Sequence, residues 1–166
     1  MSSEKLVLIG DSSLPDMDGF TQFLDSLGYK CELSPGFSFS ITDEGYFGIR
    51  VIDYPSEKPR VKPERNFIVY IDAEELLSNN FEIDEPIWAN SKQRLLFRSS
   101  VGRSNLTYAM QNLLCGYLVQ ETKGCLYDPQ QDKLLGSEEA VKNELDSIKK
   151  YGAPHDLREQ EFHGWE

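Results

Sequence analysis

Apolar residues along this chain follow two different periods, which separate predicted strands from predicted helices. The strand segments are continuous apolar runs, or runs in which apolar and polar residues alternate. The strongest is residues 67–71, where aromatic and β-branched side chains dominate. Residues 37–42 alternate apolar with Ser and Thr, so we expect a hairpin that returns through residues 46–54. We expect about six or seven strands in all, drawn from residues 5–10, 30–33, 37–42, 46–54, 67–71, 94–101, 125–127 and 133–135.

The first helical segment lies near the N-terminus. Apolar residues recur at intervals of three and four between residues 20 and 27. Asp16 or Asp18 is placed to cap the start of this helix, and Gly28 is placed to end it.

Two further helices are predicted in the second half of the chain. The longest apolar stripe covers residues 105–122 and stops at Gly124, which permits a left-handed cap. A last helix is expected from Ser137 to about residue 150, with acidic residues in its first turn and lysines in its last. Residues 73–77 predict a single helical turn.

The order of these elements indicates an α+β (or α/β) fold. We expect a single-domain sandwich over residues 1–166, in which about three helices cover a mixed, partly antiparallel sheet. Residues 55–65 hold three prolines among charges and predict an exposed loop. Residues 155–166 have no period and predict an irregular tail. Within this tail, Phe162-His-Gly-Trp165 is expected to add a strand or to pack onto the fold rather than to form a ligand site, because Phe and Trp need burial.

The charge of the chain narrows the classes of partner. The chain holds 17 Lys and Arg against 28 Asp and Glu, a formal net charge of −11. This surplus argues against nucleic acid, whose phosphates are bound by Lys and Arg, and it permits a basic protein as the partner. No apolar run approaches the roughly 20 residues of a membrane span, and no signal peptide precedes the first strand. We therefore expect a cytoplasmic protein that does not bind membranes.

The negative charge is unevenly distributed. Residues 66–91 hold six acidic residues and no Lys or Arg, whereas residues 92–103 hold four basic residues and no acidic one. Two interpretations of the acidic block stay open: a solvated surface that aids solubility, or a docking face for a cationic partner, with aromatic Trp88 and Tyr70 nearby. The candidate partner-binding residues are Asp72, Glu74, Glu75, Glu82, Asp84, Glu85 and Trp88.

Two short motifs raise the alternative of an enzyme. Gly10-Asp-Ser-Ser13 resembles the nucleophile block of SGNH esterases, which implies Ser12 as nucleophile, but no Asp precedes His155 or His163 at the spacing of that family. Residues 11–19 resemble the phosphoacceptor stretch of receiver domains, which implies Asp11 as acceptor, but only ten residues precede Asp11. Asp11 and Ser12 are therefore interpreted as a polar turn.

The sequence predicts no metal site and no cofactor. Its cysteines are Cys31, Cys115 and Cys125, and none lies in a Cys-x-x-Cys pair. We expect free thiols, with a Cys115–Cys125 bridge as the alternative. No phosphate-binding or dinucleotide-binding glycine motif is found.

The second half of the chain holds three short segments in a distinctive order: Arg103-Ser-Asn105, Gln111-Asn112 and Lys123-Gly-Cys-Leu-Tyr-Asp-Pro-Gln130. In these segments the chain resembles small bacterial immunity proteins. The resemblance implies an acidic single-domain inhibitor that covers the active site of a cognate toxin. We therefore expect a non-enzymatic protein that neutralises a toxin, such as a basic nuclease, by direct binding. The alternatives are a small enzyme that uses Ser12 or Asp11, and a structural adaptor.

Overall fold

The computed structural model describes residues 3–11, 13–55, 66–99, 105–151 and 164–165. Seven strands lie within these residues: β1 (Ser3–Ile9), β2 (Lys30–Leu33), β3 (Glu44–Asp53), β4 (Phe67–Glu75), β5 (Gln93–Ser99), β6 (Cys125–Asp128) and β7 (Lys133–Gly136). The helices among them are α1 (Met17–Ser26), α2 (Glu85–Asn90), α3 (Asn105–Thr122) and α4 (Ala140–Tyr151).

The strands form one sheet in the order β2-β3-β4-β5-β1-β6-β7, and its pairings are antiparallel. The predicted α+β class is confirmed, and the sheet is antiparallel throughout the described residues rather than partly so. The N-terminal strand β1 is central, because it pairs with β5 on one side and β6 on the other.

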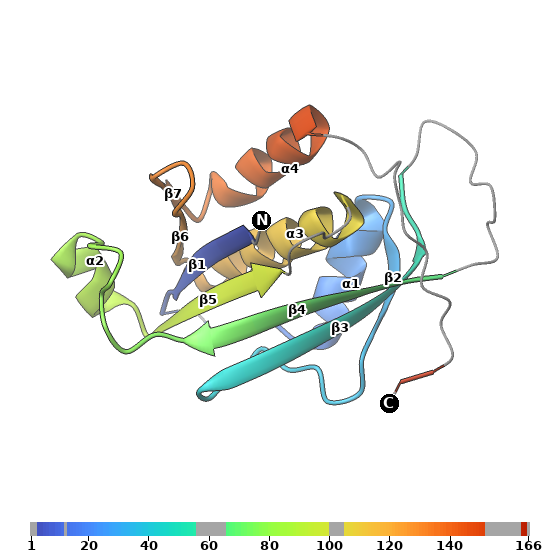
Figure 1. Cartoon of the computed structure of the whole chain (residues 1–166), viewed down its shortest axis with the longest axis horizontal. Coiled ribbons are helices and arrows are strands. Elements are labelled where there is room, and N and C mark those ends of the chain that lie inside the picture. Colours follow the sequence, from blue (N-terminus) through green and yellow to red (C-terminus); the bar gives the residue numbers. More distant parts are fainter. Residues whose placement is uncertain (1–2, 12, 56–65, 100–104, 152–163, 166) are drawn as a thin grey trace.

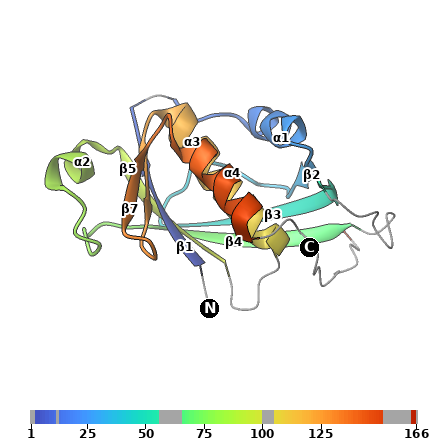
Figure 2. The ribbon, with the colours of Figure 1, turned by 90° about the horizontal axis from the view of Figure 1, so that it is seen from above.

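The helices divide unequally between the two faces of the sheet. In Figure 1, α1 and α3 lie behind the sheet, and the opposite face of β3, β4 and β5 is turned toward the viewer. Figure 2 shows α3 and α4 on one side of β5 and β7, and α2 on the other. We call the face that carries α2 the outer face. The helix α2 covers only one end of it, and no other helix among the described residues lies on the outer face of β3 and β4.

Each face of the sheet has its own apolar core. The main core joins the inward side chains of the sheet, such as Val7, Phe47 and Phe97, to α1 and α3. The helix α3 lies at its centre, with most of its side chains buried. A smaller core on the outer face packs Leu6, Leu8 and Leu96 against Ile83 and Trp88 and against flanking apolar side chains. We call residues 76–92, which carry α2, the α2 flap.

Local chemistry sets the ends of α1. The side chain of Asp16 accepts a hydrogen bond from the backbone N–H of Gly19 at 2.7 Å, so Asp16 is the N-cap. Gly28 adopts φ +92°, which ends the helix as expected. The end of α3 differs from the prediction. Lys123 takes the left-handed conformation (φ 57°), and Gly124 instead allows a close backbone approach, since a Cβ there would lie 1.9 Å from the Leu8 carbonyl oxygen.

Two predicted elements were wrong in type. Phe37, Phe39 and Ile41 are buried and alternate with exposed residues as expected, but this segment is a loop over the core, and β3 pairs with β2 instead. Residues 73–75 end strand β4 rather than starting a helical turn, because their backbone pairs with β3 and β5. Residues 56–65 of the predicted loop, and residues 155–163 and 166 of the predicted tail, lie outside the described residues.

Candidate protein-binding surface

The outer face of β3 and β4 carries a pair of exposed tyrosines. Tyr46 and Tyr70 are 58% and 43% exposed. Their rings stack with centroids 5.3 Å apart and planes inclined by 17°. Exposed aromatic side chains are enriched where proteins bind other molecules, so this face is the leading candidate for an interface.

A row of side chains crosses four strands beside these rings. Tyr46 of β3, Asp72 of β4, Arg98 of β5 and Glu4 of β1 are successive register partners, so their side chains leave the same face of the sheet. Arg98 forms ion pairs with Glu74 at 3.0 Å and with Glu4 at 3.4 Å. Asp72 makes neither an ion pair nor a hydrogen bond with another described residue. Its carboxylate therefore faces solvent without a cationic partner from the described part of the chain.

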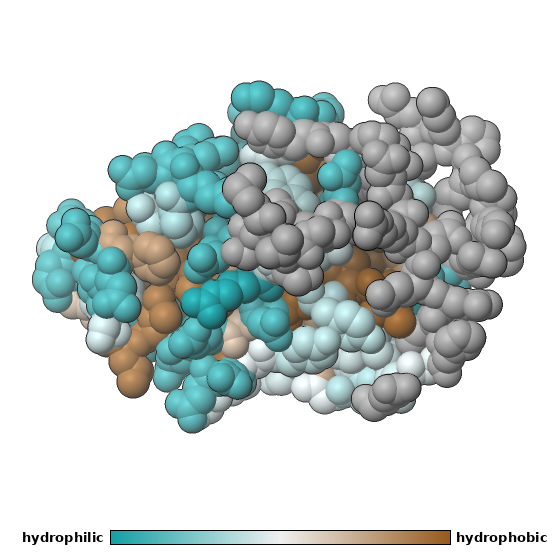
Figure 3. All heavy atoms as spheres, viewed as in Figure 1, coloured by the Kyte–Doolittle hydropathy of each residue, from teal (hydrophilic) through white to brown (hydrophobic). Residues whose placement is uncertain are grey.

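The electrostatic balance of this row is negative. Glu44 lies opposite Glu74 in the register of β3 and β4. The two glutamates are two residues away from Tyr46 and Asp72 along their strands, so they lie on the same face of the sheet. Partial burial raises the pKa of Tyr46, and Tyr70 and the Asp72 carboxylate raise it further. Tyr46 therefore keeps its proton at neutral pH, and the face offers a neutral aromatic pair beside several carboxylates. Figure 3, which views this face, shows hydrophilic and intermediate side chains over β3 and β4.

A third aromatic side chain, Trp165, lies on the same face as the two tyrosines. Gly48 is the register partner of Tyr70, and a Cβ on Gly48 would lie 3.0 Å from the Trp165 ring. The missing side chain thus leaves a notch that the indole occupies. The indole N–H of Trp165 donates to the Glu32 carboxylate at 2.8 Å. The expectation that this tail residue packs onto the fold is confirmed for Trp165, while Phe162 and His163 lie outside the described residues.

The structure divides the predicted acidic block between three places. Asp72 and Glu74 lie on the outer face of β4, beside the tyrosine pair. Glu75 points to the other side of the strand and accepts a hydrogen bond from the side chain of Gln93, which also donates to the Ile41 carbonyl. The remaining acidic residues lie on the α2 flap and are exposed: Glu82, Asp84 and Glu85.

The α2 flap is an ordered segment held by its own polar contacts. The side chain of Asn79 donates to the carbonyl of Ile83 at 2.7 Å and accepts from its N–H at 2.8 Å. The Arg94 guanidinium lies 4.8 Å from the centre of the Trp88 ring and donates to the Trp88 carbonyl. Trp88 is only 7% exposed, so it packs in the smaller core. By contrast, Leu77 at the base of the flap is 84% exposed.

Sequence reasoning identified part of this surface and missed the rest. It named Tyr70, Asp72 and Glu74, and it left out Tyr46 and Arg98. Both omitted residues were placed in predicted strands, and the outward position of Tyr46 follows from the alternation in β3. The successive buried residues of β5 give no such indication for Arg98. The register that brings Tyr46 opposite Asp72 depends on which strands pair, and pairing cannot be read from alternation alone.

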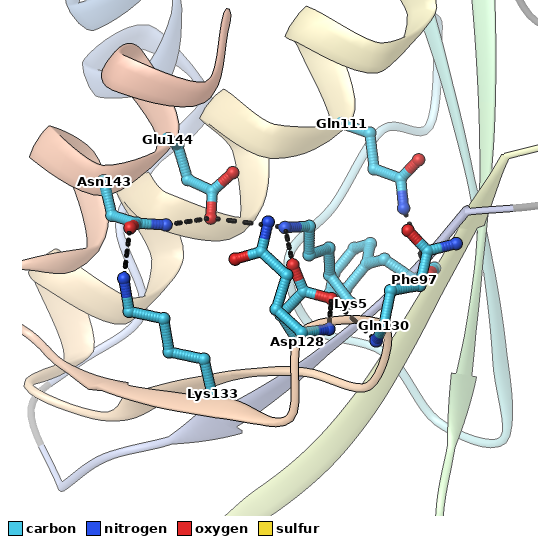
Figure 4. A network of polar contacts seen from close by, with 9 residues as sticks. Lys5, Phe97, Gln111, Asp128, Gln130, Lys133, Asn143 and Glu144 are labelled. Carbon is cyan, nitrogen blue, oxygen red and sulfur yellow. Dashed lines mark hydrogen bonds and ion pairs between the residues drawn. The ribbon is translucent and has the colours of Figure 1, made fainter. Parts of the chain in front are cut away.

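A second group of charged residues is buried between the sheet and α4. Lys5 of β1 donates to Asp128 at 2.8 Å and to Glu144 of α4 at 3.4 Å, and all three side chains are buried (Figure 4). Burial acts to lower the pKa of Lys5, but the two carboxylates outweigh it and the pKa is raised. Burial also raises the pKa of Glu144, and Lys5 offsets this only in part. Since solvent does not reach these groups, we interpret the network as structural.

The residues of the alternative enzyme hypotheses form no site among the described residues. Asp11 is exposed, and its carbonyl accepts a hydrogen bond from the Lys92 ammonium at 3.1 Å. Ser12, His155 and His163 lie outside the described residues. Cys31, Cys115 and Cys125 are free thiols. Across the part of the chain that the structure describes, no three His, Cys, Asp or Glu side chains gather as metal ligands would.

No helix among the described residues has the length and apolar content that crossing a bilayer requires. Comparisons with protein-family models, with curated proteins and with solved structures give no match for this chain.

Proposed function

We propose that this chain is a non-enzymatic binding protein whose outer sheet face docks onto a basic protein. The observation that carries the proposal is the stacked, exposed pair Tyr46 and Tyr70 beside the carboxylate of Asp72, which has no ion-pair partner among the described residues. Tyrosine contributes strongly to protein interfaces, and carboxylates around it select a cationic partner and speed its association.

The most specific form of the proposal is an immunity protein of the bacterial cytoplasm. In this form the partner is a cognate toxin, such as a basic nuclease, and the outer face covers its active site. The net charge of −11 and the likeness of residues 103–130 to immunity proteins support this form. An acidic face can occupy a site that has evolved to hold phosphates.

The test is co-expression and pull-down with the product of a neighbouring toxin gene. We expect a stable complex and survival of toxin-expressing cells. Absence of both binding and protection would reject the immunity role.

A charge-reversal pair then locates the interface. Asp72→Lys on the outer face should slow association with the toxin by about tenfold or more at low salt, because steering depends on local charge. Asp146→Lys, at an exposed position of α4, makes the same change of net charge on another surface and serves as the control. Equal effects of the two variants would show that net charge, and not the outer face, governs association.

A further inference from the structure

We propose that Tyr46, Tyr70 and Asp72 form a recognition site for an arginine side chain of the partner. The proposal rests on the proposed binding function and names the chemical group that the outer face selects. In this arrangement the guanidinium stacks on the exposed face of the Tyr46 ring and pairs with the Asp72 carboxylate.

The geometry of β3 and β4 brings the three groups together. Tyr46 and Asp72 are register partners, so their Cβ atoms lie roughly 4.5–5.5 Å apart. Tyr70 is two residues from Asp72 on the same face, and its ring stacks on Tyr46 at 5.3 Å. Tyr46 is thus stacked on Tyr70 and is still 58% exposed. A cation within about 6 Å of such a ring is attracted by the π electrons.

Carboxylates outnumber cations around the site, so the site favours a cation from outside the described residues. Arg98 is the nearest cation in the row, and it is bound by Glu74 at 3.0 Å and Glu4 at 3.4 Å. Asp72 has no ion-pair partner among the described residues, and Glu44 adds a further carboxylate to the same face. A basic residue of a partner would therefore meet a carboxylate that forms no ion pair with a described residue, because the neighbouring Arg98 is bound by Glu74 and Glu4.

Arginine fits this site better than lysine does. The guanidinium is planar, weakly hydrated and able to stack on an aromatic ring while its edge binds a carboxylate through two hydrogen bonds. An ammonium group is more strongly hydrated and offers no planar edge. The row Tyr46–Asp72 presents both features that arginine uses, a ring face and a carboxylate, on adjacent strands.

Peptide titration followed by amide and aromatic NMR tests the site without the toxin. The probes are three capped hexapeptides of Gly and Ser with one central Arg, Lys or citrulline. We expect the Arg peptide to shift the signals of Tyr46, Tyr70 and Asp72, the Lys peptide to bind about fivefold more weakly, and the neutral citrulline peptide to bind more weakly still.

Variants separate the ring from the carboxylate. Tyr46→Ala and Asp72→Asn should each weaken the Arg peptide by about fivefold or more, whereas Tyr46→Phe, which keeps the ring, should retain binding. Asp146→Asn on α4 is the matched control and should leave the titration unchanged. Because Tyr46 and Asp72 are exposed, these variants keep the fold, which their amide spectra will show directly.

Several outcomes would overturn the arginine site. They are equal binding of the Arg and Lys peptides, no shift with the Arg peptide, binding that survives Tyr46→Ala, or stronger shifts with a short oligothymidine. Each of these leaves toxin neutralisation to be decided by the pull-down and the survival assay. Conversely, an Arg-selective titration without toxin binding would reject the immunity role and keep the arginine site.

Discussion

Lys5 and Asp128 join the central strand β1 to the end of β6 through a 2.8 Å ion pair between buried side chains. Glu144 reaches the same ammonium from α4 at 3.4 Å, so one lysine connects two strands and the last helix. Asp128 also accepts a hydrogen bond from the backbone N–H of Gln130 at 2.9 Å, which orders the turn after β6. These contacts tie α4 to the sheet on the side away from the outer face.

Lys5→Met should strongly destabilise the protein. The substitution leaves Asp128 and Glu144 as buried carboxylates without a cation, and breaking such a pair costs about 3–5 kcal/mol. Urea unfolding followed by circular dichroism measures the loss. Lys133→Ala, which removes only an exposed 3.0 Å contact with the Asn143 side chain, is the control and should change the free energy of unfolding by less than about 0.5 kcal/mol.

The triple variant Lys5→Met, Asp128→Asn and Glu144→Gln should recover part of that loss. It removes all three charges, so no uncompensated carboxylate stays buried. A triple variant as unstable as Lys5→Met alone would show that packing around Lys5, and not its charge, explains the loss.

Gly124→Ala should prevent β6 from docking beside β1. The new Cβ would lie 1.9 Å from the Leu8 carbonyl oxygen and 2.9 Å from the Gly10 nitrogen, and both are backbone atoms of the central strand region. We expect a loss of about 3 kcal/mol or more, measured by urea unfolding. Gly136→Ala is the matched control. Gly136 is the register partner of Cys125, the residue that follows Gly124, and a Cβ on Gly136 would meet nothing closer than 3.9 Å. Equal stability of the two variants would contradict the clash.

The sequence predicted local periodicity better than it predicted long-range pairing. The aromatic and β-branched run at residues 67–71 located β4, and helical spacing of apolar residues located the helix that became α3, since both depend only on neighbours along the chain. Alternation also identified the burial of Phe37, Phe39 and Ile41. Whether such a segment joins a sheet depends on the neighbouring strand, and here β2 takes the place beside β3.

The candidate site was predicted in part for the same reason. The acidic block was visible as composition, but the chain distributes it over the outer face, the opposite side of β4 and the α2 flap. The contact between Gly48 and the Trp165 ring could not be predicted from the sequence, because it depends on the position of Trp165 against β3 in the folded chain. Three-dimensional proximity of this kind depends on topology.

Trp88→Ala should unfold the α2 flap and lower the stability of the whole protein. Trp88 fills the smaller core with Leu6, Leu8 and Leu96, and loss of a buried large aromatic side chain costs about 3–5 kcal/mol. Thermal or urea unfolding measures the effect. Glu82→Gln, at an exposed position of the same flap outside the helix, should cost less than about 0.5 kcal/mol. Should Trp88→Ala leave stability unchanged and weaken toxin binding, Trp88 would be an interface anchor instead of a core residue.

Cys31→Ala should make the free energy of unfolding fall less steeply with pH above about pH 9. Burial, with a contribution from Asp25, raises the pKa of Cys31 from 9.0 to about 12. The folded state therefore holds the thiol proton more tightly than the unfolded state does. This contribution is fully present below pH 9 and is lost as pH rises through about 12, with a slope of up to about 1.4 kcal/mol per pH unit. Urea unfolding of both proteins at pH 8, 9.5 and 10.5 gives the comparison. As pH rises, the free energy of unfolding of the wild type should fall steadily relative to that of Cys31→Ala. Parallel curves would show that Cys31 titrates normally in the folded chain.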